Sequence, residues 1–344
     1  MSGKRPLMWC CFATLLLVVL FVANLFLGSV SIPAAEVFRA LSGASDADAS
    51  WAFIVLQSRL PQAVTALLCG ASLAVAGLLL QTVFANPLAD PSILGVNAGA
   101  GLGVAVAMLL FGGSVVTATF SLSGFLLVVF SAFLGAALVI LVLLLCASVL
   151  KSNLMLLIAG ILISYITAAA ISLLNYVATA EGVRSYIMWG LGNFGGVSMA
   201  QLPAFVLVCV LALGVSMALI KPLNVLLLGE HYAVNLGVNV QRTRVLLLVV
   251  TGVLSAVTTA FCGPISFLGL AVPHLARLFA GTANHRVLLP LTLVCGGVTA
   301  LACNLICTLP SDGTLIPLNV VTPLWGVPVV LYILFRQRGD RTFL

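Results

Sequence analysis

Charged residues are scarce in this sequence. Only 6% of its 344 residues are Asp, Glu, Lys or Arg, whereas 62% are hydrophobic. Soluble domains carry roughly 25% charged residues, so the composition excludes an ordinary soluble domain. A membrane-spanning helix needs about 20 apolar residues, which leaves room for roughly ten spans. The sequence therefore predicts an all-α polytopic membrane protein in which residues 1–344 form a single transmembrane domain.

The sequence also lacks the residues on which most enzymes and ion carriers depend. No Gly-x-x-x-x-Gly-Lys-Ser/Thr segment occurs, so the chain has no P-loop for a nucleotide. The three histidines, His231, His274 and His285, have no ligand partner at metal-site spacing. The predicted spans carry almost no ionisable residue at mid-depth, which argues against a carrier that couples to a bare ion. We expect a transport protein that is not an enzyme and that moves a bulky ligand across a small-polar surface.

Cysteine is present, but its nine copies are not arranged as a disulfide framework. All nine lie in or at the ends of apolar segments, where cysteine behaves as a small hydrophobic residue. Cys303 and Cys307 are four residues apart and share a helix face, which is compatible with a soft-metal site or with packing. Since no His or carboxylate lies near them in sequence, we favour packing and expect no metal site.

Ten apolar segments carry the predicted spans. They are residues 7–28, 61–84, 92–111, 121–149, 154–178, 200–220, 243–263, 264–280, 287–307 and 314–335. An even number of spans places both termini on one side. With cytoplasmic termini, eleven of the 14 basic residues lie inside and only Arg39, Arg59 and Arg184 lie outside, which satisfies the positive-inside rule. This topology also accounts for the net charge of +6 without a nucleic-acid partner.

The sequence contains 31 glycines, and some of them recur at a spacing that places them on one face of a helix. Gly95, Gly99 and Gly103 are four residues apart, which lets helix backbones approach closely; packing within the chain and a subunit interface are both open. Residues 91–95 and 264–269 open similar spans, each after a Gly-x-x-x-Ala-Val stretch. Because these segments would lie on opposite sides of the membrane, they indicate an inverted repeat. Chance similarity between apolar helices is the alternative.

Motifs that run along nearly the whole chain carry a family resemblance. They are, in order, Arg59-Leu-Pro, Gly70-Ala-x-Leu-Ala-x-x-Gly77, Gln81, Asn86-Pro-Leu-Ala-Asp-Pro-x-x-Leu-Gly95, Gly229-Glu230-x5-Leu236-Gly237, Gly263-x-Ile-x-Phe267-x-Gly-Leu-x-x-Pro273-His274, His285-Arg286-x-Leu-Leu-Pro290 and Val320-Val321-Thr322. Together they resemble the permease family of iron-siderophore, haem and vitamin B12 uptake, the FecCD/BtuC-type membrane subunits of type II ABC importers.

The resemblance implies a set of partners. It suggests a ten-span subunit of the bacterial cytoplasmic membrane that pairs as a homodimer, with the transport pathway at the interface. Two ATPase subunits would dock on the cytoplasmic side and a substrate-binding protein on the outside. ATP and Mg would be bound by the ATPase partners, so this chain is expected to bind no cofactor.

The polar loop 221–242 matches the family's coupling helix, which contacts the ATPase. Its candidate residues are Gly229, Glu230, His231, Leu236 and Gly237. Polar residues that interrupt apolar ones are typical of a surface helix that meets a partner. A solvated connecting loop is the alternative interpretation.

The segment that begins at Lys151 matches the place where the family narrows its pathway on the inside. Ser152 and Asn153 are therefore candidates for a cytoplasmic gate, although both residue types also favour simple capping of the following helix. By the same resemblance, the span 154–178 lines the pathway. Its candidate lining residues are Ser164, Tyr165, Thr167 and Ser172.

Outside, the family docks its binding protein through basic residues. Arg59 matches the first arginine of the usual Arg-Leu-Pro-Arg, but Gln62 stands at the fourth position, which weakens the expected electrostatics. Arg184 is a further docking candidate.

The substrate class that the resemblance implies is a metal chelate. An iron chelate, a ferric siderophore or haem, is the main expectation because most of the family carries one. Residues 194–197 and 285–290 look closer to the vitamin B12 permeases, so cobalamin is the alternative. A stand-alone secondary transporter or channel is the competing class.

Overall fold

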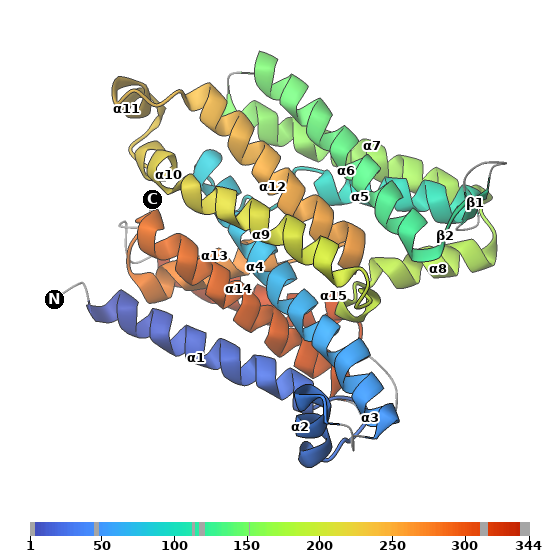
Figure 1. Ribbon diagram of the computed structural model, residues 1–344. Coiled ribbons are helices and arrows are strands. Elements are labelled where there is room, and N and C mark those ends of the chain that lie inside the picture. The colour runs from blue at the N-terminus through green and yellow to red at the C-terminus, as the bar shows by residue number, and fades with distance from the viewer. Residues whose placement is uncertain are drawn as a thin grey trace. The chain divides into compact units, whose positions relative to one another are not determined.

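The computed structural model of the chain describes residues 4–44, 48–111, 114–116, 121–150, 152–309 and 316–337. The chain divides into two compact units. Unit 1 comprises Met1–Val75, Asn193–Leu213 and Ser266–Leu344, and unit 2 comprises Ala76–Gly192 and Gly214–Ile265. Figure 1 labels the elements of both units along the chain.

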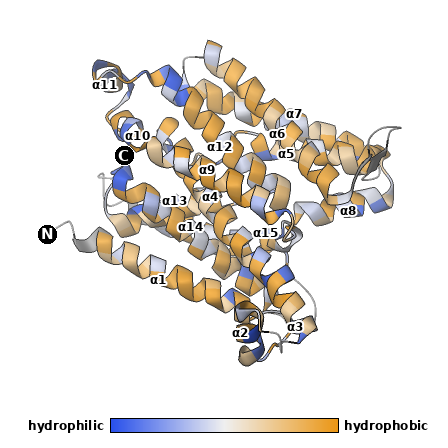
Figure 2. Ribbon diagram, in the orientation of Figure 1, coloured by the Kyte–Doolittle hydropathy of each residue, from blue (hydrophilic) through white to orange (hydrophobic). Residues whose placement is uncertain are grey.

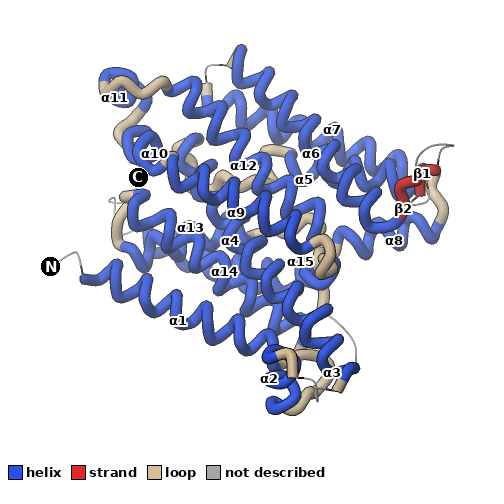
Figure 3. The backbone as a smooth tube through the Cα atoms, in the orientation of Figure 1, coloured by secondary structure: helices blue, strands red, loops and turns tan. Residues whose placement is uncertain are grey.

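Helices make up almost all of the described chain (Figure 3). They are α1 (Lys4–Phe26), α2 (Ala34–Ser42), α3 (Ala49–Phe53), α4 (Leu60–Val83), α5 (Val96–Ala105), α6 (Gly124–Val149), α7 (Asn153–Val177), α8 (Ala180–Gly190), α9 (Leu202–Ala218), α10 (Ile220–Leu226), α11 (Glu230–Asn235), α12 (Val240–Cys262), α13 (Leu268–Ala280), α14 (His285–Thr308) and α15 (Leu318–Gln337). The π-helical turns Ile54–Arg59 and Val106–Leu110 precede α4 and extend α5, and Phe194–Gly196 is a 3₁₀ turn. Strands β1 (Ser114–Val116) and β2 (Ser121–Ser123) form one short antiparallel hairpin.

Each of the ten predicted spans coincides with a helix, and the hydropathy of these helices is high (Figure 2). Within the described ranges, six helical segments are long and apolar enough to cross a membrane: Leu7–Phe26, Ala49–Val83, Gly124–Val149, Asn153–Val177, Val240–Cys262 and His285–Thr308. The bent pair Leu202–Ala218 and Ile220–Leu226 makes a seventh. The other three are the shorter apolar helices Val96–Leu110, Leu268–Ala280 and Leu318–Tyr332. The structure therefore confirms the all-α membrane class.

Several boundaries differ from the predicted ones, for local reasons. The segment predicted as 264–280 is helical only from Leu268, since Pro264 and the left-handed Phe267 (φ 70°) precede the helix. The predicted span 200–220 bends by 52° at the junction of α9 and α10. Pro222 explains this break, because a proline ring clashes with the carbonyl group four residues earlier. The first two residues of the predicted span 314–335 lie outside the described residues.

Glycine sets the packing of α5 in unit 2. A Cβ atom at Gly99 would overlap the carbonyl group of Gly135 on α6, and one at Gly103 would overlap that of Ser131. A Cβ atom at Gly95 would instead contact residues of α7. Packing within the chain is therefore confirmed for this glycine ladder, because lipid provides no hydrophobic drive between helices and close backbone approach replaces it.

In unit 1, α13 packs against α14 and α15, and α1 packs against α14. The closest approach joins α4 to α14, where Cβ atoms at Gly70 and Gly296 would each overlap the other's carbonyl group. Trp9 on α1 stacks on Phe279 of α13 with ring centroids 4.6 Å apart.

The helices within unit 1 and those within unit 2 pack in similar ways. In unit 2 the short helix α5 packs on α6 and α7, and in unit 1 the short helix α13 packs on α14 and α15. Both short helices follow a residue with left-handed φ, Gly95 (80°) and Phe267 (70°). Gly252 packs against Ile140 of α6 just as Gly70 packs against α14. These parallels support the predicted repeat rather than chance similarity.

Candidate functional site

The predicted coupling segment forms the short helix α11, bracketed by two glycines. Gly229 and Gly237 have φ of 96° and 81°, which L side chains rarely adopt, while a Cβ at either would have no described atom within 4 Å. Conformation rather than space therefore requires glycine at both ends. Ala233 is buried on the inner face of α11.

Large apolar side chains are exposed on α11 and at Leu236, the residue that follows it. Tyr232, Val234 and Leu236 are 67%, 60% and 61% exposed. His231 is exposed beside them. Large apolar side chains on a polar loop are typical of a surface that meets a protein partner. Residues 230–235 are therefore an exposed helix, and its role as the coupling helix stays a prediction.

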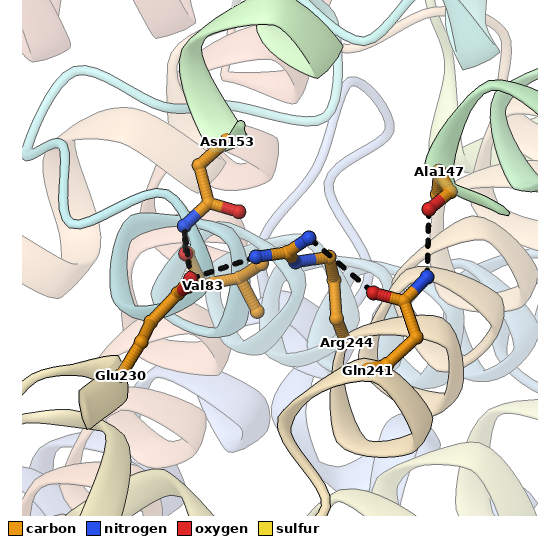
Figure 4. Close-up of polar contacts among 6 residues, drawn as sticks. All are labelled: Val83, Ala147, Asn153, Glu230, Gln241 and Arg244. Carbon is orange, nitrogen blue, oxygen red and sulfur yellow. Dashed lines mark hydrogen bonds and ion pairs between the residues drawn. The ribbon is translucent and has the colours of Figure 1, made fainter. Parts of the chain in front are cut away.

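Glu230 anchors α11 to the rest of unit 2 (Figure 4). Its Oε1 atom accepts a hydrogen bond from Arg244 Nη2 at 2.7 Å and another from Asn153 Nδ2 at 2.8 Å. Arg244 lies in the first turns of α12, and Asn153 is the first residue of α7. The predicted coupling residue and one predicted gate residue are therefore in direct contact.

Asn153 also ties α7 to the end of α4. Its Nδ2 atom donates to the carbonyl oxygen of Val83 at 3.0 Å, and its buried Oδ1 atom has no hydrogen-bond partner among the described residues. Ser152 stands at the N-cap of α7 but its exposed side chain makes no capping hydrogen bond. The capping alternative for these two residues is therefore wrong in this structure, while their role as a gate stays a prediction. Lys151 lies outside the described residues.

Gln241 extends the same network to α6. Its Nε2 atom donates to the carbonyl oxygen of Ala147 at 2.7 Å, and its Oε1 atom lies 3.5 Å from Arg244 Nη1 (Figure 4). Arg244 and Gln241 were not among the predicted site residues. A cation in the first turns of an apolar span needs a partner, and that requirement was the signal that could have found Arg244.

The predicted pathway residues on α7 do not share one environment. Tyr165 is 71% exposed and Ser172 is also exposed, whereas Ser164 is half-buried. Thr167 is only 6% exposed, and its hydroxyl donates to the carbonyl oxygens of Ile163 and Ser164 in its own helix. Thr167 therefore faces away from the exposed side of α7, and a lining role is carried better by Tyr165 and Ser172.

Arg59 is buried instead of standing free for a docking partner. It is 6% exposed, and its Nη1 atom donates to the carbonyl oxygens of Leu25 at 3.0 Å and Phe26 at 2.8 Å. Its Nη2 atom donates to the carbonyl oxygen of Val30. The guanidinium therefore satisfies carbonyl groups at the C-terminus of α1, which have no partner within the helix. A docking role for Arg59 stays a prediction that this burial does not favour.

Gln62 is engaged within unit 1 as well. Its Nε2 atom donates to Asn304 Oδ1 at 3.0 Å, and Asn304 Nδ2 donates to Asn24 Oδ1 at 2.7 Å. This chain of amides joins α4, α14 and α1. Arg184 on α8 is exposed, so it meets the first requirement for a docking contact.

The whole chain matches known transport proteins. The model of the FecCD transport family matches residues 16–336. This chain belongs to the FecCD transport family. Vitamin B12 import system permease protein BtuC of Klebsiella pneumoniae is 35% identical over 98% of this chain and 97% of its own. The BtuC protein of Citrobacter koseri is 36% identical, with 83% of each chain covered.

The fold likeness is equally extensive. An inward-facing structure of a metal-chelate type ABC transporter superposes with a TM-score of 0.82 and 31% identity, covering 95% of this chain and 98% of that one. As a FecCD protein, the chain is a permease subunit of an ABC importer, a multi-pass inner-membrane protein that works with ATPase and binding-protein partners.

The turn that follows α4 carries the family motif with a buried acid. Asp90 accepts hydrogen bonds from the backbone nitrogen of Ser92 at 2.9 Å and from its hydroxyl at 2.5 Å. Burial nevertheless raises the pKa of Asp90, because desolvation disfavours the carboxylate more than these two bonds favour it. Among the described residues no three His, Cys, Asp or Glu side chains lie close enough to hold a metal ion. Asp90 therefore shapes the turn of this FecCD permease.

Proposed function

We propose that this FecCD permease imports vitamin B12 or a closely related cobalamin. The observation that carries the substrate class is the 35% identity to a vitamin B12 permease along 98% of the chain. An iron chelate, the main expectation from the sequence, is the second candidate, because the superposed transporter is of the metal-chelate type. Selection between the two falls to the partner binding protein and to the pathway surface.

We further propose that α11 is the surface on which an ATPase subunit docks. The exposed apolar side chains of Tyr232, Val234 and Leu236 supply the contact area, and Glu230 ties this surface to the transmembrane helices. This assignment places the loop and both chain termini on the cytoplasmic side. It agrees with the distribution of basic residues in the sequence.

A homodimer with the pathway at its interface accounts for the exposed face of α7. Tyr165, Ser172 and Tyr176 are exposed, the last by 87%, and their spacings of seven and four residues place them on one helix face. These three hydroxyl groups lie on a face that also exposes Ile158 and Leu162, and polar groups are costly in contact with lipid tails. Self-complementary pairing of two copies is the usual arrangement for such a surface.

Reconstituted transport tests the proposed function. Proteoliposomes that contain the permease, its cognate ATPase and its binding protein should accumulate cyanocobalamin only with ATP, and ferric siderophore or haem should not compete. Saturable uptake of a ferric chelate without uptake of cobalamin would instead establish the iron-chelate alternative. Uptake by the permease alone, without the ATPase, would contradict the ABC mechanism and favour a secondary transporter.

Replacing Arg184 with Glu tests the outer docking surface. We expect the affinity for the binding protein to fall by about tenfold, because charge reversal at an exposed contact replaces attraction with repulsion. Surface plasmon resonance with the permease in nanodiscs measures this affinity at two salt concentrations. The same substitution at exposed Arg286 is the matched control. Equal affinities for wild type and the Arg184→Glu protein would remove Arg184 from the interface.

A further inference from the structure

One carboxylate oxygen joins three structural elements of unit 2 (Figure 4). Glu230 Oε1, at the start of α11, accepts from Arg244 of α12 at 2.7 Å and from Asn153 of α7 at 2.8 Å. The same Asn153 nitrogen reaches the last residue of α4, Val83, at 3.0 Å. Any displacement of α11 that carries Glu230 with it must therefore break the bond to the first residue of α7.

The two charged partners differ in how firmly they are held. The Arg244 side chain is 5% exposed, whereas the Glu230 side chain is 47% exposed. A desolvated guanidinium is costly without its counter-charge, so Arg244 favours the return of the carboxylate to this position. Glu230 is half in water and can leave. The geometry therefore makes Arg244 the fixed member of the pair and Glu230 the movable one.

The backbone around Glu230 is suited to such a movement. Gly229 and Gly237 flank α11 with positive φ, and a Cβ at either would have no described atom within 4 Å. Hinges consist of a few residues at element ends that absorb large changes of φ and ψ. The contacts that hold α11 in place include its buried Ala233 side chain and the bonds of Glu230.

Asn153 is held in an arrangement that leaves one of its polar atoms unsatisfied. Its Nδ2 atom has two acceptors, while its Oδ1 atom is buried with no hydrogen-bond partner among the described residues. An unmet buried acceptor costs about 1–3 kcal/mol. The nitrogen of Asn153 is therefore satisfied and its oxygen is not, which lowers the free-energy cost of leaving this arrangement.

We propose that Glu230, Arg244 and Asn153 form a release latch between the ATPase contact and the gate. When the latch is closed, Glu230 fixes the Asn153 amide, which itself bonds Val83 at the end of α4. Displacement of α11 by the ATPase withdraws the carboxylate from Asn153, so that the start of α7 keeps only its bond to Val83, and Arg244 then guides the carboxylate back. Arg244 is a positioning residue, since it acts through Glu230. This inference rests on the proposed function of the chain as an ATPase-driven permease.

The test uses the complete transporter in proteoliposomes with cyanocobalamin and compares Arg244→Gln, Arg244→Lys and Asn153→Ala with wild type. Basal ATP hydrolysis, its stimulation by loaded binding protein, and cobalamin taken up per ATP are measured. We expect Arg244→Gln and Asn153→Ala to keep hydrolysing ATP while uptake per ATP falls by about tenfold. Arg244→Lys keeps the charge and should recover most of the coupling. Arg286→Gln, which removes an exposed arginine outside the latch, should behave as wild type.

The outcomes separate the latch from the proposed function. Wild-type uptake per ATP in Arg244→Gln or in Asn153→Ala overturns the latch, and so does an equal loss in Arg244→Lys and Arg244→Gln, which would indicate packing alone. If Arg244→Gln does not assemble with the ATPase, Asn153→Ala and Arg244→Lys carry the test, because both preserve the net charge. Absence of ATP-driven uptake in the wild type itself refutes the proposed function.

Discussion

Glu230→Arg is expected to abolish transport-linked ATP hydrolysis while the protein still inserts into the membrane. The new side chain brings a second cation to the position where Arg244 now lies 2.7 Å from a carboxylate. It also offers no acceptor to Asn153. Like charges in a partly buried site repel strongly, so we expect substrate-stimulated hydrolysis to fall by more than about tenfold. Hydrolysis is measured with the ATPase, with loaded binding protein present and absent.

A charge reversal elsewhere controls for the change in net charge. Glu181 lies in the first turn of α8 and is exposed, so Glu181→Arg changes the charge equally without touching α11. This variant should retain stimulated hydrolysis. Membrane fractionation of both variants checks insertion. Unchanged stimulation in Glu230→Arg would count against α11 as the coupling helix.

Gly99→Leu is expected to prevent the permease from folding to a stable, monodisperse protein. Even a single Cβ atom at this position would overlap the carbonyl group of Gly135, so a leucine forces α5 away from α6. Overpacking costs about 1–3 kcal/mol when side chains can adjust, and more when backbone blocks the way. Against a typical total stability of roughly 5–15 kcal/mol, this is a severe loss.

Gly214→Leu provides the matched comparison for this prediction. Gly214 lies in α9, is exposed, and has no described atom within 4 Å of a Cβ added there. The yield of monodisperse protein in detergent and the midpoint of thermal unfolding are measured for both variants. Equal midpoints for Gly99→Leu and Gly214→Leu would show that the α5–α6 approach is not a determinant of stability.

The membrane spans could be predicted well because their signal is local. A helix that crosses hydrocarbon must be apolar over its whole length, so composition within one window identifies it. The boundaries were less predictable at the breaks. The chain from Gly263 to Phe267 carries no charged residue to mark a boundary, but a proline and a left-handed residue precede the next helix and delay its start until Leu268.

The contacts within the candidate site, in contrast, could not be predicted from local sequence. Glu230 and Asn153 were each predicted by resemblance, at separate sites, yet they are 77 residues apart in sequence and share a hydrogen bond. In the sequence, Arg244 is only one of the eleven basic residues that the topology places inside. No local pattern connects these three residues, because their partnership depends on how α7, α11 and α12 pack together.

The environment of Arg59 likewise could not be predicted from its sequence motif. Its place in an Arg-Leu-Pro motif predicted an exposed docking residue, whereas the fold buries its guanidinium against carbonyl groups at the end of α1. Apolar runs, glycine spacing and the order of motifs were sufficient to establish the membrane class, the helical segments and the family. Each of these features can be recognised within short stretches of the sequence. The partners of Glu230, Asn153 and Arg59 came only from the tertiary structure, because hydrogen bonding at a helix end is decided by whichever distant segment packs against it.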